Sequence, residues 1–473
     1  MEHERVVAIW GLAAYTTLLL IIIAYSVYRS WGQKRSIEIE AVGARQYGTI
    51  AIGVTIAATM LGPADAISLT ERGREYGLIW VVFPLGAALA QLVSAFIFVP
   101  RIKDGFPRAL SLGDIFEHNC SRVARVVSGS IVFVQMIAFS GVLVLAGGQI
   151  LTTFTGLSPV YGYIYTALLV GGYSSIGGLD AVIRTDKFQF VFVILILTLC
   201  VIAIGAMAGS GETLGRELLV RPSFALDHPT SAVLALICGY FLGELLLPFY
   251  SQRALIASNK ETARNGFLMA AFTIGIWYFV MTLAGSTSGI MGPRAPGDQT
   301  VIADIAQYAF NPGTAIWYVV GAVVFAGFLA LVHSTFDSIL NAGSVAFSRD
   351  LLGGLMNISP DLQGWIARQV ILPIAVCGIA VAIMGDDLIA LLMLGYTIWV
   401  PTLLPPLAWI LLRPNLRLPL IGFACAIGAG LIGWFLLDRV VATAIPGILG
   451  GFVANLVTLI AFTYRSQEKL AQE

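Results

Sequence analysis

The stretch LVHSTFDSILNAGSVAFSRD, residues 331–350, places polar side chains on consecutive turns inside an apolar run. Residues three and four apart share one face of a helix. A first stripe consists of Leu331, Ser334, Thr335 and Ser338, and a second of Asp337 and Asn341. One hydroxyl in a membrane helix usually bonds its own helix backbone. Two adjacent hydroxyls opposite a broken helix instead offer hard oxygen ligands, which suit a small alkali cation better than zinc or copper.

The composition around this stretch is that of a membrane protein. Of the 473 residues, 58% are hydrophobic and 11% are charged, whereas a soluble domain is about 25% charged. Apolar runs near the roughly 20 residues needed to cross a bilayer recur along the chain, which predicts a single all-α integral membrane domain over residues 1–473. The zero net charge suggests no nucleic-acid partner, and the five scattered cysteines suggest neither a disulfide framework nor a metal site.

The hydrophobic pattern predicts thirteen transmembrane helices. The expected spans are 6–28, 47–70, 77–101, 123–151, 158–177, 185–208, 230–250, 265–289, 312–346, 365–384, 387–411, 418–437 and 443–464. With the N-terminus outside, the inner face receives 20 of the 27 Lys and Arg residues. Cytoplasmic segments carry the excess of these residues, so we expect an outer N-terminus, a cytoplasmic C-terminus and a location in the plasma or inner membrane.

Two of the predicted spans are interrupted near their middle. The second contains Gly62, Pro63 and Asp65, and the seventh contains Glu244 followed by Pro248. Proline removes a backbone donor, and carbonyls freed within lipid must be satisfied by protein, water or an ion. The alternative for the second span is an ordinary proline kink. Interrupted helices at corresponding positions of two halves are typical of transporters with inverted repeats, which predicts a first repeat over 47–208 and a second over 230–411.

Three stretches resemble the solute:sodium symporter family. YSSIGGLDAVIRTDKFQF (173–190) is similar to the family's GGL…TD…Q signature, HSTFDSILNAGSVAFSRDL (333–351) to its hydroxyl-rich segment, and IAATMLGPADA (56–66) to its broken first core helix. The resemblance implies a LeuT-type core made of two inverted five-helix repeats, spans 2–6 and 7–11, which functions without a partner subunit. A weaker similarity in PFYSQRALIASNKETARNG (248–266) leans toward the choline-transporting branch.

The resemblance also implies a site for co-transported sodium between the second and ninth spans. The ion would be held by the carbonyls of Ala57, Met60 and Leu331 and by the hydroxyls of Ser334 and Thr335. Asp186 would lie near the inner mouth and help sodium leave. A purely structural role for Asp186, as a helix cap, is the alternative, with Thr185 as a second possible cap.

A solute site is expected near the two breaks, at mid-membrane. Its candidate residues are Asp65, Gln135, Phe241, Glu244, Tyr396 and Trp399. Tyr396 and Trp399 are alternatively interfacial aromatics, and Gln135 a bridge between helices. Acidic and aromatic side chains together favour an amine or quaternary ammonium solute, but an amino acid, a monocarboxylate or a sugar stays open.

These features favour a sodium-coupled importer of a small organic solute that works by alternating access. A proton-coupled carrier that uses Asp65 or Glu244 is one alternative, and a transporter-like sensor that acts with a partner is another. The sequence contains no HExxH or GxSxG motif and no clustered His or Cys ligands, so we do not expect an enzyme.

Overall fold

The computed structural model describes residues 2–29, 36–208, 219, 230–291, 300–310, 312–385, 388–440 and 447–472. Regular structure in these ranges is helical, apart from one isolated bridge between Tyr47 and Ala257. The polypeptide is therefore an all-α protein, as the hydrophobic pattern predicts.

The first half of the described chain contains eleven helical elements in addition to one short 3₁₀ turn. They are α1 (Glu2–Arg29), α2 (Ile37–Val42), α3 (Thr49–Met60), α4 (Pro63–Tyr76), η2 (Leu78–Val82), α5 (Leu85–Val93), η3 (Ser94–Phe98), α6 (Val99–Gly105), α7 (Leu112–Asn119), α8 (Arg122–Thr155) and α9 (Pro159–Ala208). A short 3₁₀ turn, η1 (Gly43–Arg45), joins α2 to the segment before α3.

The second half continues the bundle. Its elements are α11 (Thr230–Glu244), α12 (Pro248–Ile256), α13 (Lys260–Thr287), η5 (Ser288–Met291), α14 (Val301–Ala309), α15 (Ala315–Val345), η6 (Ala346–Leu352), α16 (Gly353–Leu355), α17 (Pro360–Met384), α18 (Leu388–Trp399), α19 (Leu404–Leu412), α20 (Leu420–Phe435), η7 (Leu436–Val440) and α21 (Gly447–Gln472).

The number of membrane-length helices can be compared with the predicted thirteen. Within the described residues, nine helical segments are long and apolar enough to span a bilayer, and two bent pairs raise the number to eleven. One of the nine, α9, has 50 residues and would be about 75 Å long if straight, more than twice the hydrocarbon thickness. It is broken at Gly178, between the predicted spans 158–177 and 185–208. The exact count of thirteen stays a prediction.

The bent pair α18–α19 was predicted as one span, 387–411. The two helices differ in direction by 43°, and the break covers residues 400–403. Pro401 lies in the break, and Pro405 and Pro406 lie in the first turn of α19, where a missing N–H costs little. The prolines therefore explain a bend that the hydrophobic pattern alone does not reveal.

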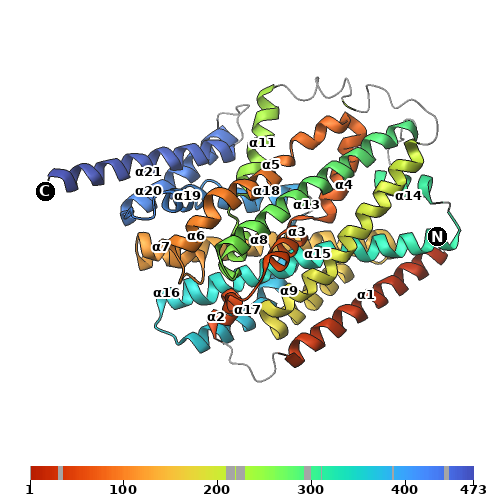
Figure 1. The fold of residues 1–473 in the computed structure, drawn as a ribbon, viewed down its shortest axis with the longest axis horizontal. Coiled ribbons are helices and arrows are strands. Elements are labelled where there is room, and N and C mark those ends of the chain that lie inside the picture. The colour runs from red at the N-terminus through yellow and green to blue at the C-terminus, as the bar shows by residue number, and fades with distance from the viewer. Residues whose placement is uncertain are drawn as a thin grey trace.

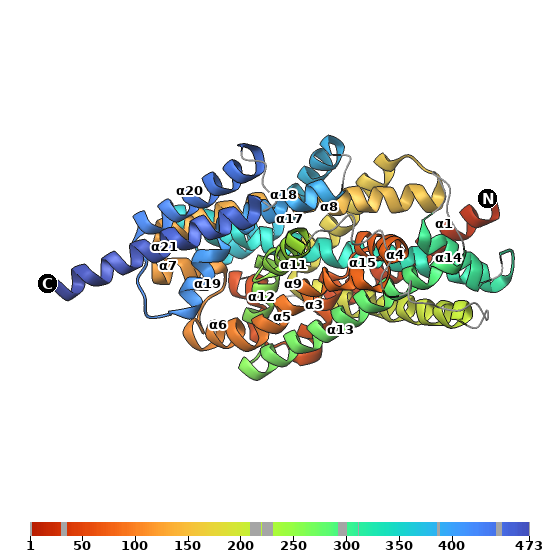
Figure 2. The same cartoon turned by 90° about the horizontal axis from the view of Figure 1, so that it is seen from above.

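The long helices pack into one bundle with helices at both ends added to its outside. Helices α3, α8, α9, α13, α15 and α17 form its centre, where each contacts at least two of the others (Figure 1). Helix α1 lies along the outside and packs on α9 and α15, while α20 and α21 pair at the opposite end (Figure 2). Helix α15, which contains the stretch 331–350, is therefore surrounded on most sides by protein.

Helix α2 closes one end of the bundle. Its Glu40 accepts a hydrogen bond from Arg368 Nε on α17 at 2.6 Å, and both side chains are buried. Ala41 O of the same helix accepts from Gln252 Nε2 on α12 at 2.9 Å. The break in α9 approaches this ion pair so closely that a Cβ on Gly178 would lie 2.4 Å from Glu40 Oε2.

Gly178 is expected to tolerate no side chain. Its φ of 60° and ψ of −159° lie in a region used almost only by glycine, and a non-glycine residue there costs of the order of 1–3 kcal/mol before any clash with Glu40. Gly178→Ala should lower the thermal midpoint of the purified protein. Gly172→Ala is the matched control, because it lies in the same helix and a Cβ there meets nothing within 4 Å. Equal midpoints for the two variants would contradict this account of the break.

Candidate functional site

The first core helix is broken where its sequence predicts. Helix α3 ends at Met60, Leu61 and Gly62 are extended, and α4 starts at Pro63. The two halves differ in direction by 62°. Since a helix end leaves its last carbonyls without intrahelical partners, those at the end of α3 need other ligands.

Helix α15 supplies those ligands with the two predicted hydroxyls. Ser334 Oγ donates to Ala58 O at 2.7 Å, and Thr335 Oγ1 donates to Thr59 O at 2.8 Å. Both hydroxyls also contact Leu331 O, at 3.1 and 3.0 Å. The hydroxyls and Leu331 O thus lie together at the end of α3, which brings Leu331, Ser334 and Thr335 onto the broken helix.

The two predicted carbonyl ligands on α3 flank the ones that the hydroxyls contact. Ala57 is fully buried, and its carbonyl accepts from Leu61 N–H at 3.0 Å. Met60 is buried and is the last residue of α3. The carbonyls of residues 57 to 60 and the two hydroxyls therefore form one oxygen-rich cluster, which we call the hydroxyl cluster.

One helical turn beyond the hydroxyl cluster lies a buried charged group. Ser338 Oγ bonds Thr59 Oγ1 at 2.9 Å and accepts from Arg253 Nη2 at 2.6 Å. The same Arg253 nitrogen lies 4.0 Å from Asp186 Oδ2, which also accepts a hydrogen bond from the Thr55 hydroxyl. Arg253, on α12, is 1% exposed and Asp186 is fully buried, so α3, α9, α12 and α15 meet around an ion pair.

Asp186 does not cap a helix. It lies inside α9, beyond the break at Gly178, whereas a cap residue lies at a helix end. Thr185 is not a cap either, because its hydroxyl bonds the carbonyls of Ala181 and Val182 and Asp337 Oδ2. The structural alternative of a helix cap is thus wrong for both residues.

The second polar stripe of α15 faces α9. Asp337 Oδ2 accepts from Tyr173 OH at 2.7 Å, and the side chain is fully buried. His333, next to the hydroxyl pair, instead faces the outer helix α1, where its Nδ1 bonds Tyr15 OH at 3.0 Å. The polar residues of the stretch 331–350 therefore point to different neighbours and do not form one site.

The second broken helix brings together three predicted solute-site residues. Helix α11 ends at Glu244, Leu246 has a left-handed φ of 56°, and α12 starts at Pro248. The Tyr396 hydroxyl of α18 donates to Glu244 Oε1. The indole N–H of Trp399 donates to Leu245 O at 3.0 Å, so Trp399 satisfies a carbonyl freed by the break.

The other three predicted solute-site residues have different surroundings. Gln135 on α8 donates to Gly395 O at 3.2 Å and so bridges α8 to α18, beside Tyr396. Phe241 is partly buried on α11, where that helix packs closely on Gly86 of α5. Asp65 lies in the first turn of α4, and its carboxylate lies beside Gly62, the residue that caps this helix.

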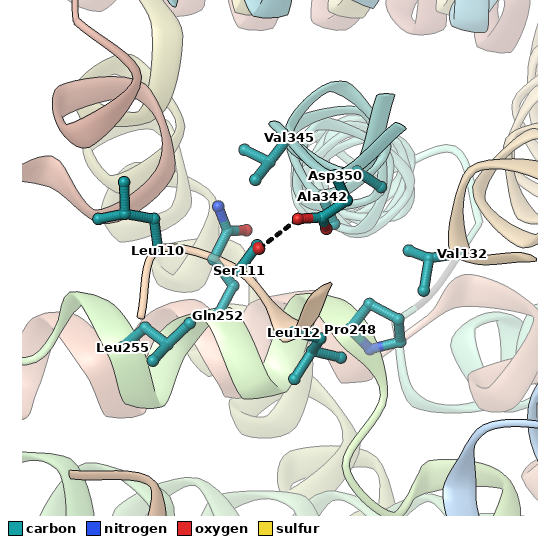
Figure 3. Close-up of a pocket in the computed structure, with 11 residues that line it drawn as sticks. Leu110, Ser111, Leu112, Val132, Pro248, Gln252, Leu255, Ala342, Val345 and Asp350 are labelled. Atoms are coloured by element: carbon teal, nitrogen blue, oxygen red, sulfur yellow. Dashed lines mark hydrogen bonds between the residues drawn. The ribbon is translucent and has the colours of Figure 1, made fainter. Parts of the chain in front are cut away.

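A small cavity lies between α8, α12 and α15, and Gln252, the neighbour of Arg253, lies in its wall. It has a volume of about 30 Å³, and its wall also includes Pro248 and Asp350 (Figure 3). The Ser111 hydroxyl points to the Asp350 carboxylate across it and donates a hydrogen bond. This space holds about one or two water molecules, so it gives no passage to a solute in the present conformation.

Comparison with known proteins identifies the family. The model of the sodium:solute symporter family matches residues 41–412, which include both broken helices and the hydroxyl cluster. The chain belongs to this family. Its members are transporters, and the symporter transports a small solute together with sodium across a membrane.

Individual relatives are distant. The chain is 24% identical to the sodium/proline symporter of Salmonella typhimurium, over 94% of this chain and 92% of that protein. It is 23% identical to the sodium/pantothenate symporter of Haemophilus influenzae, over 66% and 65% of the two chains. A putative sodium-dependent multivitamin transporter of Drosophila melanogaster is 24% identical, but the match covers 44% of this symporter and only 34% of that protein. The lean toward the choline-transporting branch stays a prediction.

Solved structures give the fold. A Na⁺-coupled sialic acid symporter, in a substrate-bound outward-open state, superposes with a TM-score of 0.79 and 18% identity, over 97% of this chain and 96% of that one. Mhp1, a nucleobase-cation-symport-1 family transporter, superposes with a TM-score of 0.56 and 13% identity, over 93% and 96%. The symporter thus has the LeuT-type fold that its sequence predicts.

Sequence reasoning missed the central role of Arg253. Arg253 follows the seventh apolar run and is one of the 20 Lys and Arg residues that the charge pattern places on the inner face, yet the whole of α12 is buried. The available signal was a charged residue shortly after an interrupted apolar segment, a pattern that marks functional sites in membrane proteins.

Arg253 is expected to be needed for stability only while Asp186 is charged. Arg253→Gln leaves a buried carboxylate without its cation, and removing one partner of a buried ion pair costs about 3–5 kcal/mol. Its unfolding free energy, measured by SDS titration, should therefore fall strongly. The double variant R253Q/D186N should recover much of that loss. No recovery would show that Arg253 stabilises the fold independently of Asp186.

Proposed function

We propose that this symporter imports a small organic solute by using sodium bound at the end of α3. The main support is the hydroxyl cluster, in which two adjacent hydroxyls of α15 contact the last carbonyls of a broken helix. In our proposal the ligands are the carbonyls of Ala57, Met60 and Leu331 and the hydroxyls of Ser334 and Thr335. All are neutral hard oxygen atoms, and a hydroxyl that turns its hydrogen away offers a lone pair to the ion.

Sodium binding would couple the position of α15 to that of the broken helix. In the structure, the two hydroxyls donate to the carbonyls of residues 58 and 59. With the ion, all five oxygens would point at one charge, which stabilises one arrangement of α3 against α15. Solute binding next to the breaks would then select the state in which the outer side closes, and the bundle would reopen to the cytoplasm.

Sodium would leave along the face of α15 that points to α12. Ser338, which bonds the Thr59 hydroxyl, lies one turn beyond the hydroxyl cluster, and Arg253 and Asp186 follow. The Asp186 carboxylate would attract the ion from the hydroxyl cluster, while the positive charge of Arg253 would prevent the ion from staying bound beside Asp186. One sodium ion that moves inward at 100 mV gains about 2.3 kcal/mol, and its concentration gradient adds to this.

Several broader features belong to the same proposal. Residues 47–208 and 230–411 would form the inverted repeats, since each begins with a broken helix. The N-terminus would lie outside and the C-terminus in the cytoplasm of a cell that carries the protein in its plasma or inner membrane. One chain would be sufficient for transport. Uptake into proteoliposomes with and without a sodium gradient separates this function from a proton-coupled carrier and from a sensor.

The hydroxyl pair should be required for sodium dependence. The double variant S334A/T335A removes two of the five proposed ligands, so sodium should no longer stimulate solute uptake in proteoliposomes or raise the thermal midpoint. Ser344→Ala is the matched control, because Ser344 is buried on the same helix but bonds only Asn341 O of its own helix. Unchanged sodium stimulation in the double variant would refute the proposed ligand set.

Asp186 should control the rate of sodium release more than sodium affinity. Asp186→Asn removes the charge but keeps a side chain of similar size, so we expect the maximal uptake rate to fall by about tenfold while the sodium concentration for half-maximal uptake changes less. Asp180→Asn is the control, since Asp180 lies on the same helix, is partly exposed and pairs with Arg184. Equal effects of the two variants on the uptake rate would argue against an exit role.

A further inference from the structure

The two carboxylates at the helix breaks face one group of tyrosines. Asp65 comes from α4 and Glu244 from the end of α11, and the two are close enough to repel each other. Four tyrosines, each on a different helix, lie near both carboxylates. They are Tyr240 on α11, Tyr250 on α12, Tyr278 on α13 and Tyr396 on α18. We call these six residues the acidic tyrosine cluster.

The acidic tyrosine cluster has no internal cation. Within the described part of the chain, neither Asp65 nor Glu244 forms an ion pair. Arg72 on α4 is a basic residue near Tyr240. It is already paired with Glu75 at 2.8 Å, and its guanidinium lies over the rings of Tyr76 and Trp80. Two other buried carboxylates do have a cation beside them, since Asp186 lies next to Arg253 and Glu40 next to Arg368. The charge of the cluster is therefore left for something outside the protein to balance.

Glu244 also has an unused acceptor that is buried. Its Oε1 accepts from the Tyr396 hydroxyl and the Tyr250 hydroxyl lies nearby, whereas the buried Oε2 has no partner with hydrogen-bond geometry in the described part of the chain. A buried acceptor without a donor costs about 1–3 kcal/mol, and more when it is charged. A ligand that donates a hydrogen bond or brings a positive charge would remove that cost.

The start of α4 is not free for an anionic group. In transporters with broken helices, half-helix N-termini attract anionic groups of the substrate. Here the chain's own Asp65 carboxylate occupies that place: a Cβ on Gly62, the residue that caps α4, would lie 3.4 Å from Asp65 Oδ2. A solute carboxylate would have to displace Asp65 and then lie next to Glu244, so the cluster disfavours anions.

We propose that the transported solute is an organic cation, with an amine or quaternary ammonium group that binds between Asp65 and Glu244. The carboxylates supply ion pairing and the tyrosine rings supply cation–π attraction. This substrate class rests on the proposed function, because it places the solute beside the two breaks.

The test compares charged solutes with uncharged analogues of the same shape. Choline, tetramethylammonium and 1,4-diaminobutane are each measured against an uncharged isostere, together with proline and pantothenate, by thermal stabilisation of the full-length protein in detergent with sodium present. At least one cation should stabilise the protein at about a tenfold lower concentration than its isostere. Failure of all three cations, or stronger stabilisation by an uncharged or anionic solute, overturns the proposal.

Variants connect the binding to the cluster. D65N and E244Q keep hydrogen-bonding side chains of the same size, so they should fold, yet each should weaken binding of the cation by about tenfold or more. E261Q is the matched control, because Glu261 is exposed in the first turn of α13, the helix that also contains Tyr278 of the cluster. Unchanged cation binding in both D65N and E244Q also overturns the proposal.

Sodium binding separates this proposal from the function on which it rests. Sodium alone should raise the thermal midpoint of wild type, D65N and E244Q alike, because the hydroxyl cluster is intact in all three. If sodium stabilises the protein but no cation does, the substrate class is wrong and sodium coupling stands. If a cation binds but sodium has no effect with or without it, sodium coupling is wrong.

Discussion

The structure depends on the need of every backbone carbonyl inside a membrane for a partner. Two core helices are interrupted at mid-length, and each interruption releases carbonyls that lipid cannot satisfy. At the first break, the hydroxyls of Ser334 and Thr335 donate hydrogen bonds to such carbonyls, and at the second break the indole N–H of Trp399 does. The same carbonyls that need a partner can bind an ion, which is why a broken helix serves as a binding element.

Charge inside the bundle is handled in two different ways. Asp186 has Arg253 next to it, and two further helices, α3 and α15, close around this ion pair, so the counterion of Asp186 is part of the folded protein. Asp65 and Glu244, which lie next to the breaks, have no such partner in the described residues, and Oε2 of Glu244 is buried. Buried charge without a counterion is costly, and a transporter can use that cost to favour the loaded state over the empty one.

The position of α2 shows how local backbone geometry and buried charge act together. Glu40 and Arg368 join α2 to α17, and they can do so only because Gly178 lets α9 bend away without a side chain in the way. Gln252, the neighbour of Arg253, connects the same helix to α12. The end of the bundle that α2 closes is thus linked through α12 to the group that we propose lies on the path of sodium.

The sequence by itself determined the membrane class, the helical fold and the position of both breaks, because these follow from apolar length and from proline and glycine, which act locally. It also predicted that Ser334 and Thr335 share a face. Only the tertiary structure decided that these hydroxyls meet the end of α3, that Arg253 lies inside the bundle beside Asp186, and that Tyr240, Tyr250 and Tyr278 join Glu244 and Asp65. Such contacts join residues up to hundreds of positions apart, and helix periodicity states which residues share a face but not which helix that face meets.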